Sequence, residues 1–230
     1  MSKKEMVMNM FDDISGRYDF LNHFLSMGTD YRWRKKFVHV LAKQCPCKIL
    51  DVATGTGDLA IALASLRPDL IHGIDISEQM LAVARKKILE KNLGRMITFD
   101  SGDAENIPFP DDTFDAVTVA FGVRNYENLE KGLTEMRRIL RPGGTMQILE
   151  FSQPTSVIFK HLYQLYSKTV IPFAGKLISG NKVAYRYLPD SVAVFPAGTS
   201  FLAIMEKTGM KELKQIPLSF GIATIYAGKK

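Results

Sequence analysis

Two acids and two glycines stand at spacings that suit recognition of a nucleoside. Asp51 closes the apolar run KILD, and Gly55 and Gly57 follow it in ATGTGDLA, a pattern typical of a turn that opens a helix. Glycine lets backbone approach a ligand closely, and the first N–H groups of a helix are free to meet oxygen atoms. Asp75 ends the next apolar run, LIHGID, where a strand-end acid is within reach of a ribose diol. The pattern therefore indicates a nucleoside-containing cofactor.

Two cofactor classes fit this spacing. Gly55-x-Gly57-x-x-Ala60, followed by an acid, also satisfies the dinucleotide fingerprint. Asp51 favours the other class, because its carboxylate repels a pyrophosphate and attracts an ammonium group. S-adenosylmethionine has an ammonium group, a sulfonium and a ribose, and it has no phosphate, so we expect this cofactor rather than NAD. The residues expected at it are Asp51, Gly55, Gly57, Asp75 and Ile76.

A third acid follows the apolar run that ends in DSGD. Asp103 begins the segment DAENIPFP, and its side chain together with the N–H of Ala104 would pair with the amino group and a ring nitrogen of adenine. Ile107 and Phe109 would pack on the faces of the adenine ring. A polar turn closed by two prolines is the plainer alternative, but the two earlier motifs favour the adenine role.

Composition and length fit one large globular domain. The chain has 230 residues, of which 46% are apolar and 23% charged. Cys45 and Cys47 are too close for an easy disulfide and too few for a zinc site, so we expect reduced thiols. The start lacks the apolar region of a signal peptide, and no apolar run approaches 18 residues. We therefore expect the protein to remain in the cytoplasm.

The charge is distributed unevenly along the chain. Residues 1–48 carry +4, residues 49–150 carry −5 and residues 151–230 carry +7, which gives the net charge of +6. Basic flanks suit nucleic acid, an anionic membrane surface or solvent, and the absence of a base-reading module argues against nucleic acid. Lysines alternate with aliphatic and aromatic residues between 157 and 182, and each adds about 1 kcal/mol near anionic lipid. We expect transient, peripheral contact with the inner face of the membrane.

The expected elements would bring these motifs together. Apolar runs predict buried parallel strands, and helical spacing predicts the segments between them. The strands are expected at 48–53, 70–75, 96–101, 115–121 and 145–151, and the helices at 57–66, 77–91 and 127–140. Arg141-Pro142-Gly143-Gly144 would stop the last helix and turn into the fifth strand. A helix at 197–208 and two strands at 211–217 and 220–227 would close the chain.

Ligands of such a sheet bind beyond the carboxyl ends of its strands. The residues that follow the fourth and fifth strands, and that we expect at the cleft, are Phe121, Gly122, Arg124, Asn125 and Glu150. Gly122 would allow close approach, and Arg124 and Asn125 would supply hydrogen-bond donors. A structural ion pair of Arg124 with Asp19 or Glu150 is an equal alternative to contact with substrate.

Nine segments resemble the ubiquinone/menaquinone biosynthesis C-methyltransferases, from about Met10 to the C-terminus. They are LDVATGTGDLA, DIS, GDAENIPFPDDTFD, FGVRN, LRPGG, LEFSQP, YRYL, SVAVFP and GIATIYAGKK. The glycine turn marks only a broad cofactor class, whereas FGVRN, EFS and YRYL in this order are specific. The resemblance implies the α/β class I S-adenosylmethionine-dependent methyltransferase fold, a seven-stranded doubly wound sheet. It also implies methylation of a ring carbon of a polyprenylated naphthoquinol, converting demethylmenaquinol to menaquinol in the last step of menaquinone biosynthesis.

The pattern of expected strands and helices predicts one domain with a helical N-terminal lid at 1–47, a cofactor-binding core at 48–153, an inserted substrate cap at 154–193 and closing elements at 194–230. The resemblance implies cofactor contacts at Thr56, Asp75, Asp103 and Ala104. Ala120 stands where the ubiquinone branch often has Ser, and Phe195 stands where many relatives have His before Pro196. A base role for that histidine therefore cannot apply.

Carbon methylation needs an electron-rich ring, which loss of a phenolic proton supplies, and an in-line approach of carbon, methyl and sulfur. Orientation accounts for about 7 to 11 kcal/mol of the barrier in well-aligned systems. The sulfonium already activates the methyl group, so we expect no metal. Our hypothesis is that Arg124 and Asn125 position the quinol, with Tyr185 or His161 near its hydroxyl. Glu150 and Tyr187 are further candidates, and His161 also fits a packed histidine on an apolar helical face.

Other readings of the chain stay open. Apolar residues recur at helical spacing near the N-terminus and are expected to form lid and core together: Phe11, Ile14, Tyr18, Leu21 and Leu25. A methyltransferase for a water-soluble molecule would not need the apolar cap, and a silent cofactor-binding subunit would leave quinols unmethylated. The oligomeric state is open between a monomer and a homodimer.

Overall fold

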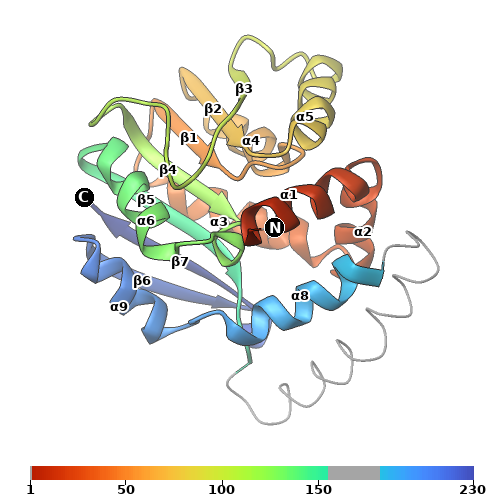
Figure 1. Cartoon of the computed structure of the whole chain (residues 1–230). Coiled ribbons are helices and arrows are strands. Elements are labelled where there is room, and N and C mark those ends of the chain that lie inside the picture. The colour runs from red at the N-terminus through yellow and green to blue at the C-terminus, as the bar shows by residue number, and fades with distance from the viewer. Residues whose placement is uncertain (1, 155–181) are drawn as a thin grey trace.

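A seven-stranded sheet forms the centre of the molecule (Figure 1). The computed structural model describes residues 2–154 and 182–230. The strand order is β3-β2-β1-β4-β5-β7-β6, with β7 antiparallel to both neighbours and the other pairs parallel. The strands are β1 (Lys48–Val52), β2 (Leu70–Asp75), β3 (Ile97–Ser101), β4 (Phe114–Ala120), β5 (Leu140–Phe151), β6 (Lys211–Leu218) and β7 (Ala223–Lys229). The predicted doubly wound sheet is confirmed.

Strand residues alternate between two hydrophobic cores on opposite faces of the sheet. Leu50 belongs to the core that α6 and α9 cover, whereas its neighbour Ile49 belongs to the core that α3, α4 and α5 cover. The helices are α3 (Thr29–Ala42), α4 (Asp58–Leu63), α5 (Glu78–Glu90), α6 (Leu129–Ile139) and α9 (Thr199–Lys207). Burial of both faces explains why apolar residues predominate in the central parallel strands.

The N-terminal segment folds as α1 (Lys3–Ile14), a 3-10 turn and α2 (Tyr18–Leu25), which lie beside the sheet in Figure 1. Ser2 and Glu5 form a capping box that fixes the start of α1. Leu21 is buried in the interior, while Phe11 and Tyr18 line a pocket. The apolar stripe expected from the sequence thus contributes to both core and pocket wall.

Two strands begin several residues away from their expected starts. β5 begins at Leu140 rather than at 145, because Leu140 already pairs with Phe114 before an irregular stretch that contains Gly143 at φ +76°. β7 begins at Ala223, after a 3-10 turn at Ser219–Gly221. The described part of the expected cap is α8 (Lys182–Val194); residues 155–181, including His161, lie outside the described residues.

Asp51 ties β1 to its neighbours from within the sheet. Its side chain is buried, and its Oδ1 and Oδ2 accept hydrogen bonds from the hydroxyls of Thr118 on β4, at 2.7 Å, and of Thr54, at 2.6 Å. Burial raises the pKa of Asp51 to about 7, although the two hydroxyls oppose this rise. A buried carboxyl that exchanges its proton near neutral pH makes stability depend on pH.

We predict that Asp51→Asn changes this pH dependence. An unfolded aspartate has a pKa of about 3.9, so between about pH 4 and pH 7 the native state holds a proton that the unfolded state releases, and the free energy of unfolding falls as pH rises. The variant has no ionisable group at this position, so its free energy of unfolding does not fall with pH for this reason. Its stability relative to wild type should therefore rise by about 2–4 kcal/mol from pH 4 to pH 8 in urea unfolding. The prediction would be contradicted if the stability difference between variant and wild type stayed the same at every pH. Such a constant difference is expected for Asp69→Asn, because Asp69 is exposed.

Candidate functional site

A pocket opens at the carboxyl ends of β1, β2 and β4, and residues of α1 line part of its wall. Its wall brings together most of the cofactor residues expected from the sequence and two of the expected substrate residues. These are Gly55, Asp75, Ile76, Asp103, Ala104, Phe121, Gly122 and Asn125. Ala120, the residue that stands where some relatives have Ser, also lines the pocket. The edge of the sheet therefore gathers these residues as the strand order predicts.

Asp75 is held rigidly at the tip of β2. Its Oδ2 accepts a hydrogen bond from the N–H of Gly55 at 2.8 Å, and its Oδ1 accepts one from the N–H of Ser77 at 2.9 Å. Gly55 lies at φ +56°, a conformation that favours glycine, and this turn directs its N–H toward the carboxylate. Burial raises the pKa of Asp75 above its usual range. Each oxygen keeps a lone pair for a hydroxyl donor such as a ribose diol.

Asp103 forms the next part of the wall. Its Oδ1 accepts from the N–H of Glu105 at 2.9 Å, and its Oδ2 pairs with the ammonium group of Lys4 on α1 at 2.6 Å. Ile107 is buried in the core, and Phe109 packs against that core. Neither lines the pocket, so the structure gives no support for their packing on an adenine ring.

Three expected cofactor residues do not line the pocket. Asp51 lies below it with both oxygens engaged by hydroxyls, and a direct contact with an ammonium group stays a prediction. Gly57 serves packing, because a Cβ there would lie 2.8 Å from Cζ of Phe99 and the residue has φ +78°. Thr56 is buried, and its hydroxyl donates to Asp19 on α2.

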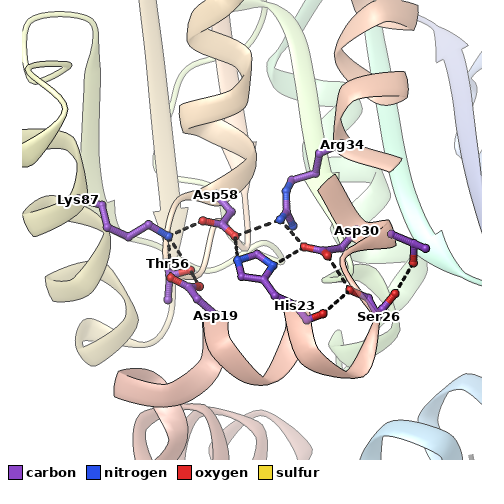
Figure 2. Close-up of polar contacts among 9 residues, drawn as sticks. Asp19, His23, Ser26, Asp30, Arg34, Thr56, Asp58 and Lys87 are labelled. Carbon is purple, nitrogen blue, oxygen red and sulfur yellow. Dashed lines mark hydrogen bonds and ion pairs between the residues drawn. The ribbon is translucent and has the colours of Figure 1, made fainter. Parts of the chain in front are cut away.

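That hydroxyl belongs to a polar cluster that joins the glycine turn to α2, α3 and α5 (Figure 2). The ammonium group of Lys87 contacts the carboxylates of Asp58 and Asp19, the latter at 2.8 Å. Arg34 Nη2 lies 3.3 Å from the second oxygen of Asp58. The sequence carried little signal for this cluster, since its members come from four separate helices. It anchors the N-terminal helices to the turn that forms the pocket floor.

Arg124 and Glu150 form a buried ion pair at the ends of β4 and β5. Arg124 Nη1 lies 2.7 Å from Glu150 Oε1, and the two side chains are 6% and 0% exposed. Of the two ion pairs expected as alternatives, the pair with Glu150 is therefore the one that forms. Arg124 Nε is buried and has no hydrogen-bond partner among the described residues. Neither residue lines the pocket, so their expected substrate contact stays a prediction.

Asn125, next to Arg124, does reach the pocket. Its Oδ1 accepts a hydrogen bond from the hydroxyl of Tyr187 on α8 at 3.1 Å, and burial raises the pKa of Tyr187. Tyr185 lies on the same helix, but its side chain is outside the described residues. The substrate roles of both tyrosines stay predictions.

Several wall residues were not expected from the sequence as ligand contacts. Lys4, Val7 and Tyr126 line the pocket. Lys4 and Val7 come from α1, and only the helical spacing that begins at Phe11 pointed to this part of the chain. The N-terminal helix is thus a wall of the pocket as well as a cover.

The described helices were also compared with the length and hydropathy of a membrane span. None of them meets both requirements alone. One pair meets them in combination, Tyr187–Val194 with Thr199–Lys207, and its two helices meet at a bend of 71°.

Solved structures share the whole fold at low identity. The [4+2]-cyclase SpnF superposes with a TM-score of 0.73 at 16% identity, covering 100% of this chain and 97% of its own. An S-adenosylmethionine-dependent methyltransferase of Thermotoga maritima, described as a possible histamine N-methyltransferase, superposes with a TM-score of 0.67 at 21% identity. The match covers 97% of this chain and 99% of the Thermotoga maritima chain. At these identities the likeness establishes the class I methyltransferase fold alone.

Sequence relatives are much closer. The ubiquinone/menaquinone biosynthesis C-methyltransferase UbiE of Geobacter sulfurreducens is 47% identical, over 99% of this chain and 90% of its own. The demethylmenaquinone methyltransferase of Bacteroides fragilis is 44% identical, over 99% of this chain and 94% of its own. The demethylmenaquinone methyltransferase of Thermus thermophilus is 46% identical, over 96% of this chain and 100% of its own. The model of the ubiE/COQ5 methyltransferase family matches residues 1–230. The chain therefore belongs to the ubiE/COQ5 methyltransferase family.

Proposed function

We propose that this chain transfers the methyl group of S-adenosylmethionine to a ring carbon of demethylmenaquinol and so forms menaquinol. The observation that carries the proposal is one pocket whose wall combines two kinds of polar group. Asp75 and Asp103 bring fixed carboxylates to this wall, and Asn125 brings an amide. Two relatives that match nearly the whole chain have the name demethylmenaquinone methyltransferase.

The two carboxylates and their neighbours in the wall fit the cofactor. The two carboxylate oxygens of Asp75 face a donor pair such as a ribose diol, while Asp103 and the backbone of Ala104 suit the edge of adenine. Val7, Phe11 and Met80 supply apolar wall beside them. When bound, the cofactor supplies a methyl group that its sulfonium makes electrophilic.

Asn125 fits the acceptor, and Arg124 precedes it in the chain. Because Asn125 Oδ1 accepts from the Tyr187 hydroxyl, its amide nitrogen remains as the donor for a quinol oxygen. Arg124 holds a positive charge behind this amide, and its buried Nε still needs an acceptor. A nearby guanidinium lowers the pKa of a phenol by stabilising the phenolate. Loss of that proton makes the ring carbon electron-rich enough to attack the methyl group.

One departure from the family pattern limits the choice of base. Phe195 is buried and packs against Phe201, with ring centroids 5.1 Å apart. It therefore cannot take the place of the histidine found in many relatives. The proposal assigns activation of the phenol to Arg124 and Asn125, with Tyr185 or His161 near the hydroxyl.

The polyprenyl tail of the acceptor gives the protein a reason to work at a membrane. We propose transient contact with the inner face of the membrane, with residues 154–193 guiding the tail. A homodimer is compatible with the proposal, which does not require one.

The decisive assay is methyl transfer from labelled S-adenosylmethionine to reduced short-chain demethylmenaquinol, in parallel with a demethylated benzoquinol. We expect labelled product from the naphthoquinol. Product from both would extend the proposal to a second quinone class. Cofactor binding without methylation of either quinol would overturn it, in favour of a soluble substrate or a silent subunit.

Arg124→Lys tests the role of the guanidinium while it keeps a positive charge beside Glu150. We expect kcat for the naphthoquinol to fall on the order of 10²-fold, because the forked donor that stabilises the phenolate is lost. The binding constant for S-adenosylmethionine should stay near that of wild type in calorimetry. Full turnover in a folded variant would show that Arg124 is structural only.

Tyr187→Phe removes a hydrogen bond that orients the Asn125 amide. Loss of a bond of about 1 kcal/mol should lower kcat/KM for the quinol about three- to tenfold, with cofactor binding unchanged. Thr134→Val on α6, which removes an exposed hydroxyl bonded to its own helix, is a control. An equal effect of the two variants would contradict the orienting role.

A further inference from the structure

Large apolar side chains cover the outer side of α2 and of the first turn of α3. The exposed fractions are 59% for Phe20, 51% for Phe24, 77% for Met27 and 57% for Tyr31. Phe20 and Phe24 lie one helical turn apart with their rings stacked at 6.0 Å, and Tyr31 stacks on the ring of His23 at 4.3 Å. We call these four residues the α2–α3 apolar face. Four such side chains within twelve residues concentrate apolar exposure in one short segment of the chain.

Two polar residues of α2 point into the protein. Figure 2 shows Asp19 and His23 of α2 directed at Thr56, Asp58 and Lys87 in the polar cluster. A surface helix ordinarily presents polar residues to water and apolar ones to the core. Here α2 buries ionic contacts and exposes phenylalanines, an arrangement that suits an apolar or interfacial environment outside the protein.

Charge is also sorted between the two sides. The acids between residues 14 and 37 are Asp19 and Asp30, and both are used inside the cluster, Asp30 by Arg34 and His23. The bases Arg32, Lys35 and Lys36 are exposed on α3, where they occupy one helical face. The outer side of this region is therefore aromatic and cationic. Aromatic side chains beside basic ones are the pattern of a surface that binds anionic lipid.

We infer that the α2–α3 apolar face inserts into the interfacial layer of an anionic membrane, while Arg32, Lys35 and Lys36 meet lipid headgroups. This rests on the proposed membrane contact and assigns it a second surface, distinct from residues 154–193. The position supports the inference, since α2 begins at Tyr18, which lines the pocket. Docking through α2 holds the pocket beside the layer that contains a polyprenylated substrate.

The test is co-sedimentation of the full chain with vesicles of phosphatidylcholine, with and without phosphatidylglycerol. Wild type should bind the anionic vesicles, and Phe20→Ser/Phe24→Ser should bind them at least about tenfold more weakly. Leu89→Ser, which removes an equally exposed apolar side chain from α5, should bind within about twofold of wild type. Lys35→Gln/Lys36→Gln should lose the preference for the anionic vesicles.

Activity separates this inference from the proposed function. All these variants should methylate a short-chain quinol in solution at the wild-type rate, because none of the changed residues lines the pocket. Unchanged vesicle binding by Phe20→Ser/Phe24→Ser would overturn the inference. A second result would also overturn it: the variant keeps its vesicle binding, but its molecular mass in sedimentation falls below that of wild type. That result would assign the α2–α3 apolar face to contact with a second copy of the chain.

Discussion

The buried ion pair between Arg124 and Glu150 fixes the part of the pocket where substrate chemistry is proposed. Charges taken out of water are costly unless further hydrogen bonds satisfy them. Here Glu150 Oε1 also accepts from the N–H of Phe151 at 2.8 Å, and Arg124 donates to the carbonyl of Phe121. Breaking such a pair leaves one charge unpaired, at a cost of about 3–5 kcal/mol. The turn from Phe121 to Asn125 therefore has one stable arrangement, and the pocket residues on it are preorganised.

The N-terminal helix depends on that same turn. The ammonium group of Lys3 donates to the carbonyls of Arg124, at 3.1 Å, and Tyr126, at 2.6 Å, while Lys4 pairs with Asp103 on the opposite side of the pocket. α1 thus bridges the loops that follow β3 and β4. The basic N-terminal flank and the acidic core seen in the sequence are in part complementary within the molecule, so the charge asymmetry did not by itself identify an external partner.

The sequence predicted the sheet better than the directions of its side chains. Mostly apolar runs predicted the five parallel strands, because a sheet covered on both faces favours apolar residues in such strands. Which way Asp51 points was not predictable, since it depends on the Thr118 hydroxyl of a neighbouring strand. Thr56 is a similar case, because its partner Asp19 comes from a helix 37 positions earlier. The choice of Glu150 over Asp19 for Arg124 follows from the same packing, as Asp19 is already held by Lys87.

The acidic wall also bears on the exchange of the spent cofactor for a new methyl donor. Asp75 and Asp103 face the pocket, and Asp51 lies beneath it. Methyl transfer turns a sulfonium into a neutral thioether, so the carboxylates attract the methyl donor more strongly than the product left behind. In this structure Lys4 supplies the cationic partner of Asp103, and α1 carries that lysine on the pocket wall. A ligand at Asp103 must therefore share or replace the contact with Lys4, which couples the seating of α1 to the state of the cofactor site.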